Sequence, residues 1–270
     1  MRIEQAGMSR RAQQSGDQWT EIFVNRSEAE ESANAASSVI NGDSIFVIHG
    51  LATPDECKLL RGEAMNYKPE ISFDPIAELQ AASKLVRRPV IDMCGEEGQA
   101  LCDQLLIRAI SSVPVSLPNL VLGKKLTESL TADEVSMSIM DHTEVCFSDG
   151  EPAINVYSVD GAFRPHKDQE ALTVLLNLSE EKAYAGGGTG FWSVADSTRG
   201  RSREDPAGRL GPDTWAPPTV VIRPPVGSAL VFVGTVMHGG LRVTSGVRCT
   251  LVSSFSPKER KAARTSPEVS

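Results

Sequence analysis

Residues 157–168 read YSVDGAFRPHKD and place His166 and Asp168 two positions apart. Side chains at positions i and i+2 of a strand point to the same face, so one short segment can offer an imidazole and a carboxylate to one ion. With a histidine from elsewhere, they would complete the set of two imidazoles and one carboxylate that holds non-haem Fe(II) and leaves coordination positions open. The stretch therefore predicts a metal site carried by β strands.

The candidate for the third ligand is His238, and Arg248 follows it ten positions later in a strand-like run. A guanidinium can bind a carboxylate through two parallel hydrogen bonds, so Arg248 is the expected anchor for a dicarboxylate co-substrate. Thr250 shares the strand face of Arg248. A histidine and aspartate at this spacing also occur by chance in solvated surface turns. The joint presence of His238 and Arg248 favours the metal site over that alternative.

From Pro152 onward, short β-branched or alternating runs are separated by Gly, Pro and Asp. The runs span residues 153–159, 171–178, 190–193, 219–223, 229–233, 238–243 and 247–255. Closely spaced short strands of this kind predict a sandwich or a barrel. We expect a mainly β (α+β) protein whose core is a double-stranded β-helix, a jelly roll of the cupin-like type, with N-terminal helices packed against it.

Two helices are predicted ahead of these strands, after a strand at residues 44–49. Residues 53–56, TPDE, have the pattern of a capping box with Pro at the first helical position, and this helix should end near Ala64. Apolar residues at helical spacing predict the second helix over residues 96–112. Further elements, a helix near 123–129 and a strand near 135–140, are expected before the core.

The chain divides into three parts by composition. Residues 1–43 are polar and are expected to be disordered or weakly structured, with a short helix near Asp17–Arg26. Residues 44–256 form one domain, with the barrel core at about 152–256, and residues 257–270 form a flexible tail. Within the core, residues 195–218 are rich in Arg, Ser, Asp, Gly and Pro, and they predict a mobile loop over one end of the barrel.

Charge and cysteine usage limit the classes of partner. The formal net charge of −8 gives no basic surface for nucleic acid, and no apolar run is long enough to predict a membrane span. The 5 cysteines are scattered without a Cys-x-x-Cys pair, so neither a disulfide framework nor a zinc site is indicated. We expect a cytoplasmic protein. Arg2, Arg10 and Arg11 leave organelle targeting as the alternative.

Three motifs together resemble the Fe(II)/2-oxoglutarate dioxygenases, specifically their prolyl 4-hydroxylase-like branch. Residues 157–168 are similar to that branch's Tyr-x-x-Gly…His-x-Asp signature, residues 186–191 (GGGTGF) to its Gly-Gly-x-Thr-x-Phe turn, and residues 225–232 (PVGSALVF) to its Pro-x-x-Gly lead into the second histidine. The resemblance covers residues 44–256. It implies that this region is the dioxygenase domain.

The resemblance also implies a role for individual residues. His166, Asp168 and His238 would be the catalytic iron ligands, and Arg248 would form the salt bridge to the C5 carboxylate of 2-oxoglutarate. Tyr157 would donate its hydroxyl to the co-substrate, with Thr250 as a helper, while O2 and ascorbate would serve as oxidant and reductant.

Two positions depart from the family pattern. Phe163 stands where many relatives have tyrosine, and Arg248 stands where many peptide-modifying relatives have lysine.

The implied activity is hydroxylation of an organic substrate with release of succinate and CO2. The aspartate at position 168 favours hydroxylation over halogenation, because related halogenases have a small residue there. A peptidyl residue such as proline is the first expected substrate, a free amino acid or small metabolite the alternative, and a methylated nucleic acid the third. The alternative to an enzyme is a binding module that has the jelly-roll fold but no catalytic activity. The sequence leaves the oligomeric state open.

Overall fold

The computed structural model describes residues 8–15, 18–25, 44–67, 84–116, 145–168, 170–192, 215, 217–218 and 220–257. The helix expected near 123–129, the strand near 135–140, nearly all of the 195–218 loop and the tail beyond Pro257 lie outside these ranges. Within these ranges, no helix is both long enough and apolar enough to span a membrane.

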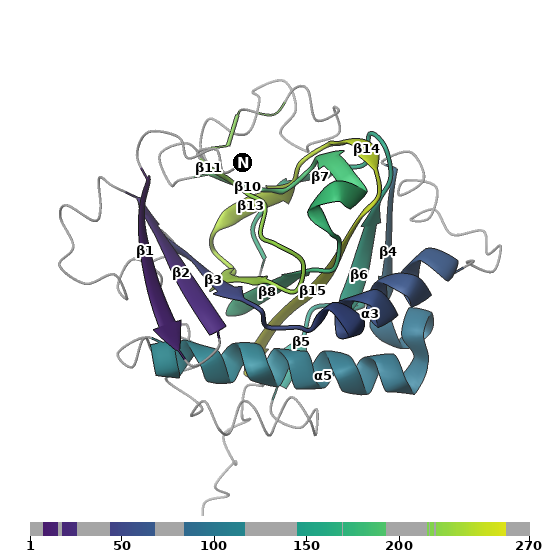
Figure 1. Ribbon diagram of the computed structural model, residues 1–270, viewed down its shortest axis with the longest axis horizontal. Coiled ribbons are helices and arrows are strands. Elements are labelled where there is room, and N and C mark those ends of the chain that lie inside the picture. The colour runs from purple at the N-terminus through teal and green to yellow at the C-terminus, as the bar shows by residue number, and fades with distance from the viewer. Residues whose placement is uncertain are drawn as a thin grey trace, which may run out of the picture.

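Two antiparallel sheets face each other and form the core (Figure 1). The larger has the strand order β1-β2-β3-β12-β8-β15-β6-β4, with β5 pairing with β15, and the smaller has the order β11-β10-β13-β7. The strands of the larger sheet are β1 Met8–Ser15, β2 Gln18–Asn25, β3 Ser44–His49, β4 Leu85–Pro89, β5 Val145–Phe147, β6 Ala153–Tyr157, β8 Leu172–Asn177, β12 Ala229–Val233 and β15 Arg248–Pro257. The smaller sheet contains β7 Phe163–His166, β10 Thr189–Trp192, β11 Val220–Ile222 and β13 Met237–Gly240, while β9 Tyr184–Gly186 pairs with β14 Val243–Gly246.

Two helices, α3 (Pro54–Asn66) and α5 (Val90–Ser116), lie on the side of the larger sheet that faces away from the smaller one (Figure 1). A short 3-10 helix, η1 (Glu181–Ala183), precedes β9. Leu60 of α3 and Leu105 of α5 belong to one buried cluster with Ile154 of β6. The helices therefore cover the outer face of the sheet.

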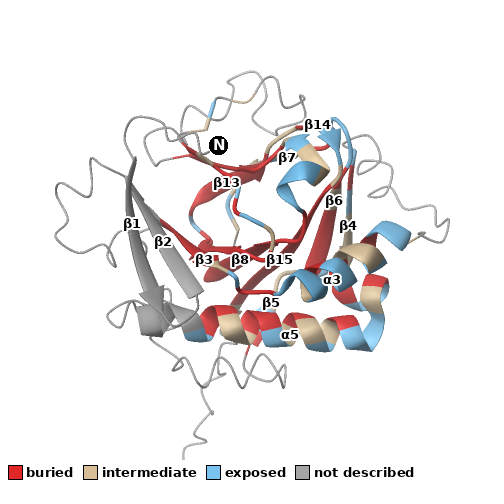
Figure 2. Ribbon diagram, viewed as in Figure 1, coloured by how far each residue is buried: buried red, intermediate tan, exposed pale blue. Residues whose placement is uncertain are grey.

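Because one face of the larger sheet meets helices and the other meets the second sheet, its strands are apolar at successive positions. In β3, Phe46 and Ile48 pack with the helices, whereas the alternate residues Ile45 and Val47 pack between the sheets. Side chains alternate across a strand, so burial on both faces requires a continuous apolar run. Figure 2 shows this sheet as buried along its central strands.

The expected jelly-roll fold with a bracing helical layer is confirmed, and the strand runs predicted after Pro152 correspond to β6, β8 and β10–β15. The run predicted at 238–243 covers most of β13 and only the first residue of β14, which continues to Gly246. The second helix begins at Val90 rather than Glu96 and is kinked at Gly95, whose φ is 62°.

At the N-terminus the structure differs from the expected disorder and short helix. Residues 8–25 contain β1 and β2, and β2 pairs with β3. The sequence QWTEIFVN of β2 is rich in residues that favour strands, and the edge of β3 offers unpaired backbone groups to it. Tertiary pairing thus outweighs the polar composition of the surrounding segment.

Gly227, in the motif 225–232, adopts a φ of +77° at the turn into β12. A Cβ added at this position would lie 2.3 Å from the carbonyl oxygen of Ala52, and the Ala52 amide donates to the Gly227 carbonyl at 3.0 Å. Any side chain would disrupt this contact. The glycine of the motif therefore joins the start of the β12 segment to the approach to α3.

We expect Thr53→Ala to lower the free energy of unfolding by about 1 kcal/mol, the usual cost of losing an N-cap. The Thr53 hydroxyl accepts from the Glu56 amide at 3.2 Å, and the Glu56 carboxylate accepts from the Thr53 amide at 2.8 Å, so the capping box is complete. Urea denaturation monitored by circular dichroism measures the change. Thr53→Ser, which keeps the hydroxyl, should retain most of the stability; equal losses in both variants would contradict the capping role.

Candidate metal centre

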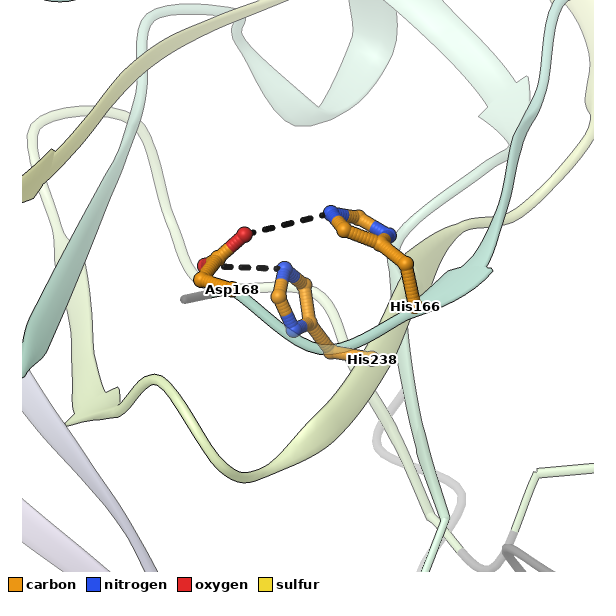
Figure 3. A group of neighbouring side chains, drawn as sticks. All are labelled: His166, Asp168 and His238. Carbon is orange, nitrogen blue, oxygen red and sulfur yellow. Dashed lines mark ion pairs between the residues drawn. The ribbon is translucent and has the colours of Figure 1, made fainter. Parts of the chain in front are cut away.

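His166 and His238 are neighbours across two strands of the smaller sheet. His166 is the last residue of β7, His238 lies in β13, and the two are directly paired in the antiparallel register. Directly opposed residues present their side chains to the same face, and the two ring centroids lie 4.4 Å apart. Two histidines that are distant in sequence thus meet because of strand pairing (Figure 3).

Asp168 completes the group from just beyond the end of β7. Its Oδ1 lies 3.4 Å from His166 Nε2 and its Oδ2 lies 3.6 Å from His238 Nε2 (Figure 3). One ligand atom from each of the three residues lies within 4.8 Å of the others. The three residues can therefore each offer one ligand atom to a single ion.

The ring nitrogens that point away from Asp168 fix the tautomer of both histidines. His166 Nδ1 lies 2.9 Å from the Arg164 carbonyl oxygen, and His238 Nδ1 lies 3.1 Å from that of Val236. A carbonyl oxygen only accepts, so each Nδ1 carries the hydrogen and each neutral ring keeps a lone pair on Nε2. This is the usual second contact of a metal-bound histidine.

Asp168 is held as a carboxylate. Burial raises its pKa, but the contact with His166, the charge interactions with both histidines and the hydroxyl of Thr173 outweigh burial and lower the pKa to about 2. Thr173, in β8, donates to Oδ2 at 2.5 Å. The aspartate is therefore ionised at neutral pH. Its position depends on β8 rather than on strand spacing, because β7 ends before it.

His238 is held neutral by its surroundings. Its burial is the largest cause and the charge of a protonated His166 adds to it, so its pKa falls to about 4 despite opposing effects of Asp168 and the Val236 carbonyl. The ring lies among the aromatic rings of Phe191 and Phe232, with centroids 6.3 and 4.7 Å away. A neutral imidazole is the form that binds metals.

A cavity with about 460 Å³ of empty space, part of it open to solvent, extends from the three residues toward β15. Arg248 lines it, although its side chain is 3% exposed, and its Nη2 donates to Thr189 Oγ1 at 3.2 Å. Among the described residues, Arg248 Nε and Thr250 Oγ1 are both buried and have no hydrogen-bond partner. A buried guanidinium with an unused donor is costly, so this end of the cavity suits an anionic ligand.

Tyr157 lies beside Arg248 on the neighbouring strand and is opposite it in the β6–β15 register. The guanidinium carbon of Arg248 stands 5.1 Å from the centroid of the Tyr157 ring. Gly240 leaves room for that ring, since a Cβ there would lie 2.7 Å from the Tyr157 hydroxyl oxygen. Phe163, which replaces a family tyrosine, lines the cavity and packs on the His166 ring at 4.7 Å.

Residues 186–188 form a turn that needs glycine at each position, with φ of 71°, 58° and 97°. A Cβ on Gly187 would lie 3.3 Å from Arg248 Cδ. The GGGTGF motif thus lets the backbone approach the arginine and supplies Thr189 as its hydrogen-bond partner.

All six candidate residues predicted from the sequence line one cavity in the structure: the three metal-site residues, Arg248, Tyr157 and Thr250. Sequence reasoning therefore found most of the charged and polar groups of the site. It missed four more side chains in or beside this cavity, namely Arg87, Glu151, Asn155 and Thr173, and it marked Thr189 only as part of the motif at residues 186–191. For Asn155, spacing was an available signal, because it lies two positions before Tyr157 on the same face of β6. Nothing in the local sequence marks Glu151 or Arg87.

We expect the metal-free protein to lose stability on acidification from about pH 6.5 to about pH 4. The folded pKa of His238 is about 4 and that of the unfolded chain about 6.5, so the unfolded chain binds the proton first. Stability then falls with pH in this window, by on the order of 2–3 kcal/mol. Unfolding free energies of chelator-treated protein, measured at neutral pH and at about pH 4.5, check this. His238→Gln should show a shallower fall, and identical falls would refute the assignment.

No protein-family model and no curated protein matches the sequence. Among solved structures, HygX from Streptomyces hygroscopicus, with nickel, 2-oxoglutarate and hygromycin B bound, is similar at 14% identity and a TM-score of 0.51, covering 80% of this chain and 83% of that one. EvdO2 from Micromonospora carbonacea var. aurantiaca (15%, 0.49, 80% and 88%) and the viral collagen prolyl hydroxylase of Paramecium Bursaria Chlorella virus-1 (16%, 0.45, 82% and 99%) also match. The comparison with HygX shows that this chain has the jelly-roll fold of a protein that binds 2-oxoglutarate.

Proposed function

We propose that this protein is an Fe(II)- and 2-oxoglutarate-dependent dioxygenase that hydroxylates an organic substrate. The proposal rests on the observation that a three-residue metal site and a buried arginine line the same cavity. His166, Asp168 and His238 offer three ligand atoms to one ion, and Arg248 presents an unused buried donor in the same space. HygX, which has this fold, holds a metal and 2-oxoglutarate.

The residues present fit the iron. Two neutral imidazoles and one carboxylate form the donor set that Fe(II) oxygenases use, and the tautomers of both rings leave Nε2 free to bind. When bound, the ferrous ion supplies the activation of O2, with 2-oxoglutarate as the source of two electrons and with succinate and CO2 as products. Ascorbate is the proposed reductant that keeps the iron ferrous.

The protein's own side chains bind and orient the co-substrate. Arg248 and Thr250 would hold its distal carboxylate, because their unpaired Nε and Oγ1 are the groups that burial leaves unsatisfied. Tyr157 stands opposite Arg248 and supplies a hydroxyl to the same space. The apolar residues Leu175 and Val252 line the cavity as well and limit the access of water to the reacting groups.

Two classes of substrate are supported by different observations. The three sequence motifs resemble those of the prolyl 4-hydroxylase-like branch, which supports a peptidyl residue such as proline. HygX binds hygromycin B, a small molecule, on the same fold, and this supports a free amino acid or another small metabolite. Succinate release stimulated by a peptide pool and not by metabolites would select the first class, and the reverse result would select the second.

Anaerobic addition of Fe(II) and 2-oxoglutarate should give the weak visible charge-transfer band of a metal-chelated 2-oxo acid. The band requires the three ligand residues, so Asp168→Ala should abolish it while the fold persists by circular dichroism. On admission of O2, succinate should form. Absence of the band in the unmutated protein, with no change in its stability, would favour the non-catalytic binding module instead.

Arg248→Ala should raise the dissociation constant for 2-oxoglutarate on the order of 100-fold, because a buried carboxylate loses its charged partner. Arg248→Lys keeps the charge but not the two parallel donors, so a smaller rise of about tenfold is expected. Calorimetric titration of the nickel-loaded protein measures both. Unchanged affinity in Arg248→Ala would place the co-substrate elsewhere.

A further inference from the structure

A row of polar side chains crosses three strands of the larger sheet beside the proposed co-substrate site. In the register, Arg87 of β4 is opposite Asn155 of β6, and Asn155 is opposite Thr250 of β15. Tyr157 follows Asn155 by two positions and is opposite Arg248. Directly paired and alternate residues share a face, and all five line the cavity.

The hydrogen bonds along this row have a fixed direction. Arg87 Nη1 donates to Asn155 Oδ1 at 3.2 Å, and Asn155 Nδ2 donates to the Tyr157 hydroxyl oxygen at 3.3 Å. A guanidinium has donors and no acceptor, so it selects the orientation of the amide in which Oδ1 faces Arg87. Nδ2 must then face Tyr157, and the tyrosine oxygen is the acceptor of this contact.

The direction has a consequence for the tyrosine's own hydrogen. Asn155 donates a hydrogen bond to the hydroxyl oxygen of Tyr157, so the hydroxyl hydrogen has to be donated to a different group. The guanidinium of Arg248, whose central carbon is 5.1 Å from the ring centroid, cannot accept it. A carboxylate oxygen in the cavity can, and hydrogen bonds to charged acceptors are among the stronger ones.

Arg87 is itself held in place from β15. Its Nη2 forms an ion pair with Glu151 Oε1, and Glu151 Oε2 accepts from the Ser254 backbone amide and, at 2.7 Å, from the Ser254 hydroxyl. The side chain of Glu151 is only 4% exposed, so the pair is anchored within the protein. The chain of contacts thus runs from Ser254 through Glu151, Arg87 and Asn155 to the tyrosine.

We propose that Asn155, oriented by Arg87, is a positioning residue that makes the Tyr157 hydroxyl a hydrogen-bond donor to a carboxylate of the co-substrate. The inference rests on the proposed function, because it takes 2-oxoglutarate as the ligand of the cavity. It goes beyond that function by assigning a role to two residues that do not touch the metal site. A purely structural role for the row, bracing β4 against β6, is the competing explanation.

A double-mutant cycle separates the two explanations. Asn155→Leu is close in size, neutral and unable to orient the hydroxyl, so it should raise the dissociation constant for 2-oxoglutarate about fivefold to tenfold, the scale of one hydrogen bond to a charged group. In a Tyr157→Phe background the same substitution should have little effect, because no hydroxyl remains to be oriented. Calorimetric titration of the nickel-loaded full chain, which does not turn over, provides the constants.

Asn155→Asp gives a second test with a reversed contact. The carboxylate still accepts from Arg87 but also accepts from Tyr157, which turns the hydroxyl hydrogen away from the cavity. When Tyr157 is present, Asn155→Asp should raise the dissociation constant for 2-oxoglutarate more than Asn155→Leu does. In the Tyr157→Phe background, the difference between the two variants should shrink to the part that the added negative charge alone causes. An excess of the same size in both backgrounds would overturn the proposal.

Arg87→Met extends the test to the orienting residue, with Arg88→Met as the matched control on the opposite face of β4. Arg87→Met should weaken 2-oxoglutarate binding only when Tyr157 is present, and Arg88→Met should leave it unchanged. Two results would show that the row is only a structural brace: equal weakening of 2-oxoglutarate binding by Arg87→Met in both backgrounds, or no coupling between Asn155 and Tyr157. Either result would overturn this inference and leave the proposed function intact. Failure of the unmutated, nickel-loaded protein to bind 2-oxoglutarate would overturn the proposed function as well.

Discussion

The antiparallel pairing of β7 with β13 is the constraint on which the proposed site depends. It sets His166 directly opposite His238, although most of the core separates them in sequence. A shift of the register by one residue would turn one ring to the other face of the sheet and destroy the site. The same two strands also pair Gly240 with Phe163, and the register shifts between that pair and the histidine pair. The meeting of the two histidines therefore depends on this one pairing.

The apolar contacts of the surrounding fold offset the free-energy cost of the buried polar groups at this site. The larger sheet is buried on both faces, by helices on one side and by the smaller sheet on the other, and these apolar contacts supply most of the stability. Against them stand buried polar groups that have no partner among the described residues, such as Arg248 Nε and Thr250 Oγ1. Each costs free energy in the ligand-free protein. Such groups persist where a ligand completes them, which is why they locate a binding site better than burial alone does.

How far the sequence could predict this structure depends on whether a feature is local. The capping box at 53–56 and the apolar runs of β12 and β15 are local patterns, and the structure confirms them. The convergence of His166, Asp168 and His238 was foreseen through motif and resemblance, and the geometry brings the three together. The strands β2 and β4 were not foreseen, because they pair with β3 and β6, which lie farther along the chain, and β1 in turn pairs with β2. Glu151 escaped notice for the same reason: its partners Arg87 and Ser254 come from β4 and β15.

The charges around the cavity suggest that metal and co-substrate bind together. Glu151 and Arg87 neutralise each other as an ion pair, and when both histidines are neutral, as metal binding requires, Asp168 and Arg248 carry the remaining charges among the described residues that line the cavity. A divalent cation next to Asp168 leaves a net positive charge, and a dicarboxylate next to Arg248 leaves a net negative one. Either ligand alone therefore places uncompensated charge in a largely buried space, where such charge is expensive. Both together cancel, so each should increase the affinity for the other, and by linkage the two increases must be equal.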